Sequence, residues 1–237
     1  MNKIDGFKKI DGLEAVILFG SKARNDADNN SDVDIFILID DNYSEVNKNN
    51  LIKKVSRIID DKKTNVSLYS KEVFNKMLDD GSMFLWHLKL EGKYIFNRYN
   101  MDIFKGLNDF QNYRKNLNLY KDLFAEAKES ITTNMVNSYD LSMLFFLCRN
   151  LSLLTCFKIG RPNFGKYSAY NELIYYLGFE PIRWENYIIL SKWRMNFTRG
   201  IGDNLMYPSV LETNKIISEI EVLFSFCEEI LSKEVNQ

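Results

Sequence analysis

The feature that most constrains the fold is a change of sequence pattern near residue 100. Before it, short runs rich in β-branched and aromatic residues alternate with helical patterns, whereas the rest of the chain has apolar residues at helical spacing almost throughout. The predicted strands are 15–20, 34–40, 64–70 and 93–96. We therefore predict an α+β protein. Residues 1–98 form a domain with a short mixed β-sheet and helices, and residues 99–237 form an all-α helical bundle.

Helical patterns lie between the predicted strands and dominate the second half. In the first domain, helices are expected over 45–60 and 71–78. In the second domain, residues 141–157 are apolar on nearly every face, which predicts a central buried helix. Residues 188–197 and 210–231 are typical of amphipathic helices that flank such a core.

Composition and charge exclude several classes of protein. Lys and Arg number 31 against 32 Asp and Glu, a formal charge of −1, so no overall positive field attracts long nucleic acid or favours a template-directed polymerase. The three cysteines have no metal-ligand spacing, and their odd number without an export signal leads us to expect reduced thiols and a cytoplasmic location. Arg149 interrupts the longest apolar run well before the roughly 18 residues that a membrane span needs. We expect no membrane partner.

The stretch 19–39, FGSKARNDADNNSDVDIFILI, brings two aspartates to the entrance of a buried strand. Asp32 and Asp34 are two residues apart, so their side chains project to the same side of the chain. Two carboxylates this close repel each other and resist desolvation unless a cation lies between them. Oxygen ligands of this kind suit Mg²⁺, which is usually shared with substrate phosphates. The alternative, a solvated acid pair at the strand entrance, is disfavoured by the Gly-Ser pair that precedes it.

Gly20 and Ser21 supply the other half of this predicted site. Glycine lets the chain turn sharply and approach a ligand closely. Ser21 is predicted to be the N-cap of a helix beginning at KARND, which would aim free backbone amides and the helix dipole at an anion. A phosphate-holding turn followed by a metal-holding strand predicts a nucleoside-triphosphate site.

FGSKAR followed by SDVDIFIL resembles the signature of the DNA polymerase beta-type nucleotidyltransferase superfamily. It is most similar to the small bacterial branch that includes antibiotic nucleotidyltransferases and MNT-type adenylylating antitoxins. The order of strands and helices extends the resemblance to about residue 98. The resemblance implies transfer of a nucleoside monophosphate from an NTP, with ATP expected, to a hydroxyl of an antibiotic-like small molecule or of a protein, with release of pyrophosphate.

The same resemblance implies roles for individual residues. Asp32 and Asp34 are the catalytic residues that hold metal, with two Mg²⁺ ions expected, and Gly20 and Ser21 bind the triphosphate. Arg24 is included among the nucleotide-binding residues, although it could instead pin the loop by pairing with an aspartate. The expected partners are an NTP and a small-molecule or protein acceptor, and a homodimer is compatible with the sequence.

The sequence departs from the family pattern on the third predicted strand. Active members generally have a third carboxylate there, which binds metal or acts as the general base. Here the strand reads TNVSLYS, and the position falls near Asn65 or Ser67, neither of which is a base at neutral pH. Three explanations stay open: a base from elsewhere, water as the proton acceptor, or a non-catalytic nucleotide-binding or antitoxin-like protein. The candidate bases are Glu72, Glu91, Glu172 and Glu185.

Several other residues with chemically active side chains receive structural interpretations. His87 is expected to pack beside Trp86, and the cysteines of the apolar helix to lie in the core. Arg149 lies within that helix and needs an acidic partner or a ligand, so an interdomain ion pair and a substrate contact are both open. The helical domain lacks the Arg-x(4–6)-His motif of HEPN ribonucleases, and we expect it to close a cleft over nucleotide and acceptor.

Overall fold

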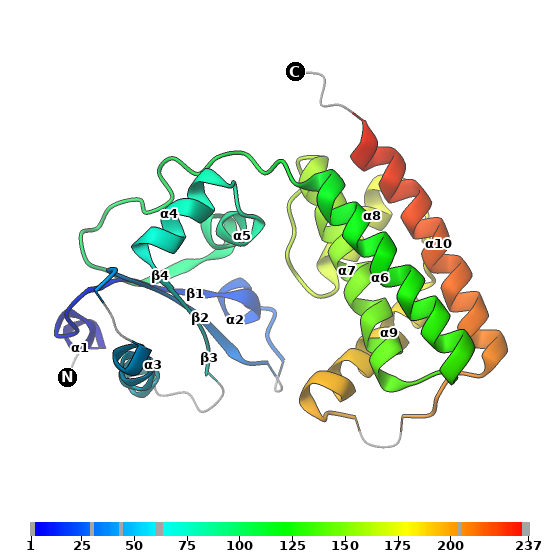
Figure 1. Cartoon of the computed structure of the whole chain (residues 1–237), viewed down its shortest axis with the longest axis horizontal. Helices are drawn as coiled ribbons and strands as arrows, with labels where there is room; N and C mark the ends of the chain where they lie inside the picture. Colours follow the sequence, from blue (N-terminus) through cyan, green and yellow to red (C-terminus); the bar gives the residue numbers. More distant parts are fainter. Residues whose placement is uncertain (1–2, 29–30, 43–44, 60–63, 203–204, 234–237) are drawn as a thin grey trace. The chain divides into compact units, whose positions relative to one another are not determined.

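The computed structural model describes residues 3–28, 31–42, 45–59, 64–202 and 205–233 (Figure 1). Contacts within the chain divide it into two compact units, Met1–Gln111 and Asn112–Gln237. The first unit holds a mixed four-stranded sheet with helices, and the second is helical, so the predicted α+β class is confirmed. The predicted domain boundary at residue 98 falls in the segment after the last strand and stays a prediction.

The sheet has the strand order β3-β2-β1-β4. Its strands are β1 (Leu13–Phe19), β2 (Val33–Ile39), β3 (Thr64–Ser70) and β4 (Lys93–Asn97). All four predicted strands are confirmed to within two residues at each end. β1 runs antiparallel to both β2 and β4, whereas β2 and β3 are parallel. A parallel pair needs a long crossover, and the helix α3 (Glu45–Ile59) provides it.

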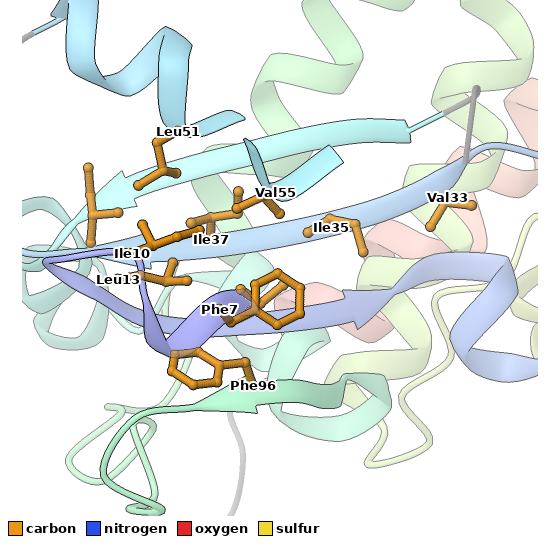
Figure 2. Close-up of a cluster of buried hydrophobic side chains, with 11 residues drawn as sticks. Phe7, Ile10, Leu13, Val33, Ile35, Ile37, Leu51, Val55 and Phe96 are labelled. Atoms are coloured by element: carbon orange, nitrogen blue, oxygen red, sulfur yellow. The ribbon is translucent and has the colours of Figure 1, made fainter. Parts of the chain in front are cut away.

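Helices cover both faces of this sheet (Figure 1). α1 (Lys3–Lys8) and α3 pack on one face, while α4 (Lys71–Asp79) and α5 (Met83–Glu91) pack on the other. The side chains that fill the first layer converge between strands and helices in Figure 2. They are Phe7, Ile10, Leu13, Val16, Val33, Ile35, Ile37, Ile39, Leu51, Val55 and Phe96. Burying one such side chain fully stabilises the fold by about 1.5–3 kcal/mol.

The alternation of side chains along β2 decides which face receives the acidic residue of this strand. Ile35 and Ile37 belong to the α1–α3 layer, whereas Phe36 belongs to the α4–α5 layer. Because side chains alternate with a period of two, Asp34 lies in phase with Phe36. The carboxylate of Asp34 therefore belongs to the face that α4 and α5 cover.

The second unit is built around one central helix. It comprises α6 (Tyr113–Asn134), α7 (Ser138–Lys158), α8 (Ser168–Leu177), α9 (Trp184–Arg199) and α10 (Val210–Ser232). α7 contacts all the others, which confirms the central buried helix that its all-round apolar surface predicts. In the described part of the chain, α7 is also the one helix long and apolar enough to cross a membrane. Within the unit, 72% of that apolar window is buried, as a core helix requires.

Candidate active site

The turn that follows β1 lies directly against the carboxylate of Asp34. Gly20 has a left-handed backbone with φ of +69°, and a Cβ added to it would lie 2.4 Å from Oδ2 of Asp34. The strand register causes this approach, because Phe19 is paired with Asp34 across the antiparallel ladder. Only glycine satisfies both the backbone angle and the contact. The sequence prediction of a sharp turn with close approach therefore agrees with this geometry.

Ser21 does not have the capping role that the sequence suggested. The short helix α2 spans Gly20–Arg24, its N-cap is Phe19, and no side chain makes a capping hydrogen bond there. The N-cap prediction for Ser21 was therefore wrong, because the helix begins one residue before Ser21 and its N-cap is Phe19. The backbone amide of Ser21 still belongs to the first turn, whose N–H groups have no intrahelical acceptor. Its proposed role toward a triphosphate stays a prediction.

Asp34 and its neighbour on β3 form a polar pair at the start of two parallel strands. Asp34 is in register with Asn65, and Nδ2 of Asn65 donates a hydrogen bond to Oδ1 of Asp34 at 3.1 Å. Asp32 immediately precedes β2, and both aspartates are half-buried. The register also decides between the two positions considered for a third carboxylate. Ser67 is paired with Phe36, farther along the strand, so Asn65 occupies the position beside Asp34.

The donor set suits a small divalent cation that shares its ligands with a substrate. Asp32 and Asp34 offer carboxylate oxygens, and Mg²⁺ is usually bound by one or two carboxylates together with phosphate and water. Among the described residues, no group of three or more His, Cys, Asp or Glu side chains is arranged to hold a metal. The protein groups that the structure describes therefore fit a site that nucleotide phosphates complete, rather than a closed protein cage.

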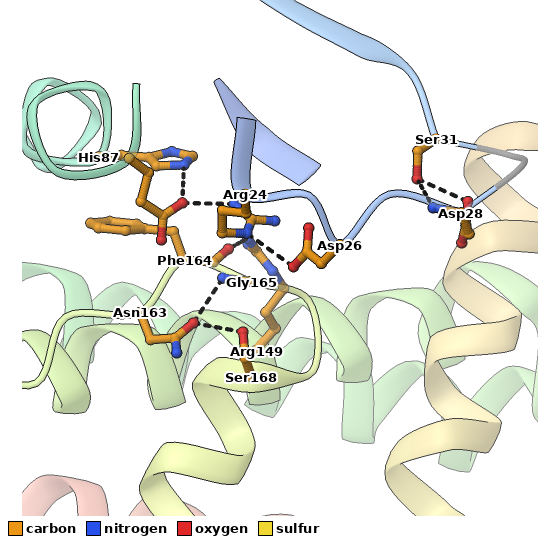
Figure 3. Close-up of polar contacts among 11 residues, drawn as sticks. Arg24, Asp26, Asp28, Ser31, His87, Arg149, Asn163, Phe164, Gly165 and Ser168 are labelled. Carbon is orange, nitrogen blue, oxygen red and sulfur yellow. Dashed lines mark hydrogen bonds and ion pairs between the residues drawn. The ribbon is translucent and has the colours of Figure 1, made fainter. Parts of the chain in front are cut away.

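Arg24 connects α2 to α5 through a largely buried network (Figure 3). Its Nη1 donates to Oε2 of Glu91 at 2.7 Å, and its Nε donates to Oδ2 of Asp26 at 3.0 Å. His87, one helical turn before Glu91, lies with Nε2 3.1 Å from the same Oε2. The side chains of Arg24, Glu91 and His87 are only 18%, 15% and 16% exposed. The network therefore fixes the α2 turn against α5.

The electrostatics of this network keep both partners ionised. Burial opposes ionisation of Glu91, but hydrogen bonds from His87 and Arg24 outweigh it, so the pKa of Glu91 lies below its ordinary value. Burial likewise acts to lower the pKa of Arg24, yet its hydrogen bonds to Glu91 and Asp26 raise it overall. The loop-pinning alternative for Arg24 thus agrees with its contacts, with Asp26 and Glu91 as partners. Nucleotide binding by Arg24 stays a prediction.

His87 and Glu91 show what the sequence reasoning missed. His87 packs edge-on against Phe19 of β1 at a centroid distance of 5.6 Å, a contact that the sequence did not indicate, while its expected packing beside Trp86 stays a prediction. The spacing of four residues between His87 and Glu91 on an expected helix was the available signal, since such residues are neighbours on a helix surface. Arg24 lies 67 residues away from Glu91 in sequence, and nothing in the local pattern indicates that pair.

The four candidate bases differ in their exposure and in their contacts. Glu91 is engaged with Arg24 and His87 beside α2. Glu72 is exposed in the first turn of α4, where its backbone amide donates to Asp41. In the second unit, Glu172 pairs with Arg161, and Glu185 lies exposed in the first turn of α9. Glu91 is the one of these four that contacts the segment proposed to bind nucleotide.

Arg149 of the second unit has a backbone partner in its own unit. Its Nη2 donates to the carbonyl oxygen of Phe164 at 2.7 Å, as Figure 3 shows. The loop that carries Phe164 is held by Asn163, whose Oδ1 accepts hydrogen bonds from the backbone amide of Gly165 and the hydroxyl of Ser168. Arg149 thus joins the central helix to this loop. The two alternatives considered for it, an interdomain ion pair and a substrate contact, stay predictions.

Comparison with known proteins agrees with the motif. Residues 2–101 match the model of the polymerase beta nucleotidyltransferase family. The resemblance that the motif suggested is therefore confirmed for this segment. No curated protein matches the chain.

Solved structures that match the chain include an adenyltransferase and a toxin–antitoxin structure. The spectinomycin adenyltransferase AAD(9) from Enterococcus faecialis, solved with ATP and spectinomycin, is 16% identical with a TM-score of 0.48, over 98% of this chain and 99% of that chain. A toxin–antitoxin structure with AMP-PNP is 23% identical with a TM-score of 0.30, over 57% of this chain and 100% of that chain.

Proposed function

We propose that the N-terminal unit is an Mg²⁺-dependent nucleotidyltransferase. It transfers a nucleoside monophosphate from an NTP, with ATP as the donor, to a hydroxyl of a small molecule or of a protein. The observation that carries this proposal is the close approach of Gly20 to the Asp34 carboxylate, 2.4 Å from an added Cβ, within a segment that matches the nucleotidyltransferase family. A glycine turn and a carboxylate in contact bring phosphate-binding amides beside metal-binding oxygens.

In this proposal the acidic pair binds the metal and the α2 turn binds the phosphates. Asp32 and Asp34 would hold the metal, which supplies neutralisation of charge on the phosphates when bound. The first-turn amides of α2, including that of Ser21, would donate to triphosphate oxygens. The hydrogen bond from Asn65 orients one carboxylate oxygen of Asp34, and the Arg24–Glu91 pair keeps the turn in position. The acceptor oxygen then bonds to the α-phosphorus while the bond to pyrophosphate breaks.

The proton of the acceptor hydroxyl needs a destination in this reaction. Asn65 cannot accept it, because a carboxamide is not a base at neutral pH. Glu91 is a weak candidate, because its lowered pKa and its two hydrogen-bond donors favour a carboxylate that stays ionised. Water is therefore the proposed proton acceptor in the first unit, and this predicts a slow reaction with a weakly acidic acceptor.

A second candidate function is nucleotide binding without efficient transfer, as in an antitoxin-like regulatory protein. It is favoured by the amide of Asn65, which stands beside Asp34 where active members of the family generally have a third carboxylate. Both functions share the same nucleotide site. They differ only in whether pyrophosphate is released.

The decisive experiment measures binding and turnover in the same preparation. The full chain is incubated with Mg²⁺ and each labelled NTP, with and without a panel of hydroxyl acceptors, and both pyrophosphate release and labelled product are followed. Transfer that disappears in Asp34→Asn supports the enzyme. Tight Mg²⁺-dependent binding with no pyrophosphate over the whole panel supports the regulatory alternative, and absence of any nucleotide binding contradicts both.

A further inference from the structure

A polar hollow lies on the first unit, on the α1–α3 face of the sheet. It has a volume of about 710 Å³ and is bordered by the segment after α1 and by the exposed side of α3. Asp40, at the end of β2, closes one side. Because the side chain of Asp34 is in phase with the opposite face, this hollow is separate from the candidate active site. We call it the α1–α3 groove.

The α1–α3 groove is lined by more positive than negative charge. Its cations are Lys9, Lys53, Lys54 and Arg57, and its carboxylates are Asp11 and Asp40. All four cations are exposed, and none takes part in an ion pair with another described residue. Elsewhere basic side chains do find acidic partners, as in Lys71–Glu14, Lys121–Glu228 and Arg183–Glu219. What distinguishes the groove is that four cations without an ion-pair partner among the described residues line one hollow.

The spacing of these cations along α3 brings like charges close to one another. Lys53 and Arg57 are four residues apart and Lys54 and Arg57 three apart, so each pair lies on neighbouring turns of the same side. Like charges at these spacings destabilise a helix, whereas opposite charges would stabilise it. An anion held between the three side chains would reverse the sign of these interactions. Asn47 and Asn50 line the same groove and add amide donors and acceptors.

We propose that the α1–α3 groove binds the phosphoryl group of a small phosphorylated ligand. Arg and Lys side chains are the usual partners of phosphate oxygens, and the asparagine amides would contact the remainder of the ligand. The volume falls within the range of small-molecule sites. A long nucleic acid is a poorer fit, since the groove is bordered by Asp11 and Asp40 and the chain as a whole carries a charge of −1. The proposal does not depend on nucleotidyl transfer.

The test compares two double variants that remove the same charge from the same unit. Lys53→Gln with Arg57→Gln alters the groove, whereas Lys76→Gln with Lys105→Gln removes two exposed cations outside it. Binding of inorganic phosphate, pyrophosphate and AMP is measured by calorimetry without divalent cations, after circular dichroism has verified that each variant is folded. We expect the groove variant to weaken the tightest of these ligands by about tenfold or more. The control should leave affinity unchanged within about twofold.

Other outcomes separate the sources of binding and can overturn the proposal. Tighter binding of AMP than of inorganic phosphate identifies a ligand whose organic part reaches the amides, while equal binding identifies the phosphate alone. Asp34→Asn should retain the binding, because it alters the other face of the sheet. The proposal is overturned if no probe binds, or if both double variants weaken binding equally. It is also overturned if only Asp34→Asn loses binding, or if a single-stranded oligonucleotide binds more tightly than every small ligand.

Discussion

Replacing Gly20 with alanine tests the site where turn and carboxylate meet. The added Cβ would lie 2.4 Å from Oδ2 of Asp34, and ordinary contact begins at 3.4 Å, so one of the two groups must move by about 1.0 Å. Displacement of a positioned group by about 1 Å can lower an enzymatic rate by about 100-fold. The left-handed backbone adds a stability cost of about 1–2 kcal/mol for any residue with a Cβ.

A matched variant separates these two effects. Gly106 lies in the same unit with φ of +87°, and a Cβ added there would meet nothing within 4 Å. Gly106→Ala should therefore share the backbone cost without the displacement. Urea unfolding followed by circular dichroism measures stability, and Mg²⁺-dependent nucleotide binding and pyrophosphate release measure the site.

We expect both variants to lose about 1–2 kcal/mol of unfolding free energy. Only Gly20→Ala should also lose about 100-fold in transfer rate, or a comparable factor in Mg²⁺-dependent nucleotide affinity if the protein does not turn over. Wild-type binding and transfer by a folded Gly20→Ala protein would refute the idea that the turn and Asp34 form one site. Equal loss of function in Gly106→Ala would show that the loss in Gly20→Ala comes from lower stability and not from displacement of Asp34.

Three further predictions concern charge and burial. Asp34→Asn should abolish Mg²⁺-dependent nucleotide binding in calorimetry while leaving the melting temperature within a few degrees, and retained Mg²⁺ dependence would contradict the metal assignment. Glu91→Gln should cost about 2 kcal/mol near neutral pH. Because the folded pKa of Glu91 is depressed, this contribution is complete above its ordinary pKa of 4.5 and is lost as the pH falls through the folded value, so urea midpoints of wild type and variant should converge in acid. Burial raises the pKa of Cys156 and Cys227 to about 12, so at pH 8 thiol reagents should label the protein in urea but not when native.

The strands could be predicted from sequence because each is a short run with a definite end. Strand β2 combines alternating burial at its start with a continuous apolar run, and Gly20 ends β1 abruptly. The central helix α7 was equally clear, since no face of it is polar. Local pattern also indicated that Asp32 and Asp34 lie together, because two residues of separation fix their relation in an extended chain.

What could not be predicted depends on contacts between distant segments. The helices on both faces of the sheet follow from the way α1 and α5 pack, and α1 is too short and charged to be recognised from its pattern. The partner of Arg24 is set by β1 and β4 lying side by side, which brings the end of α5 to the turn. The choice of Asn65 over Ser67 needed the strand register, which a single sequence does not specify.

The ion pair between Arg24 and Glu91 has a kinetic consequence. The α2 turn is held to α5 before nucleotide binds, so it already has its bound conformation. Little conformational entropy is therefore lost on binding. Association should then follow a single exponential whose rate rises linearly with nucleotide concentration, with no plateau from a slow rearrangement of this segment. Without the Arg24–Glu91 ion pair, the α2 turn would have to become ordered when the nucleotide binds.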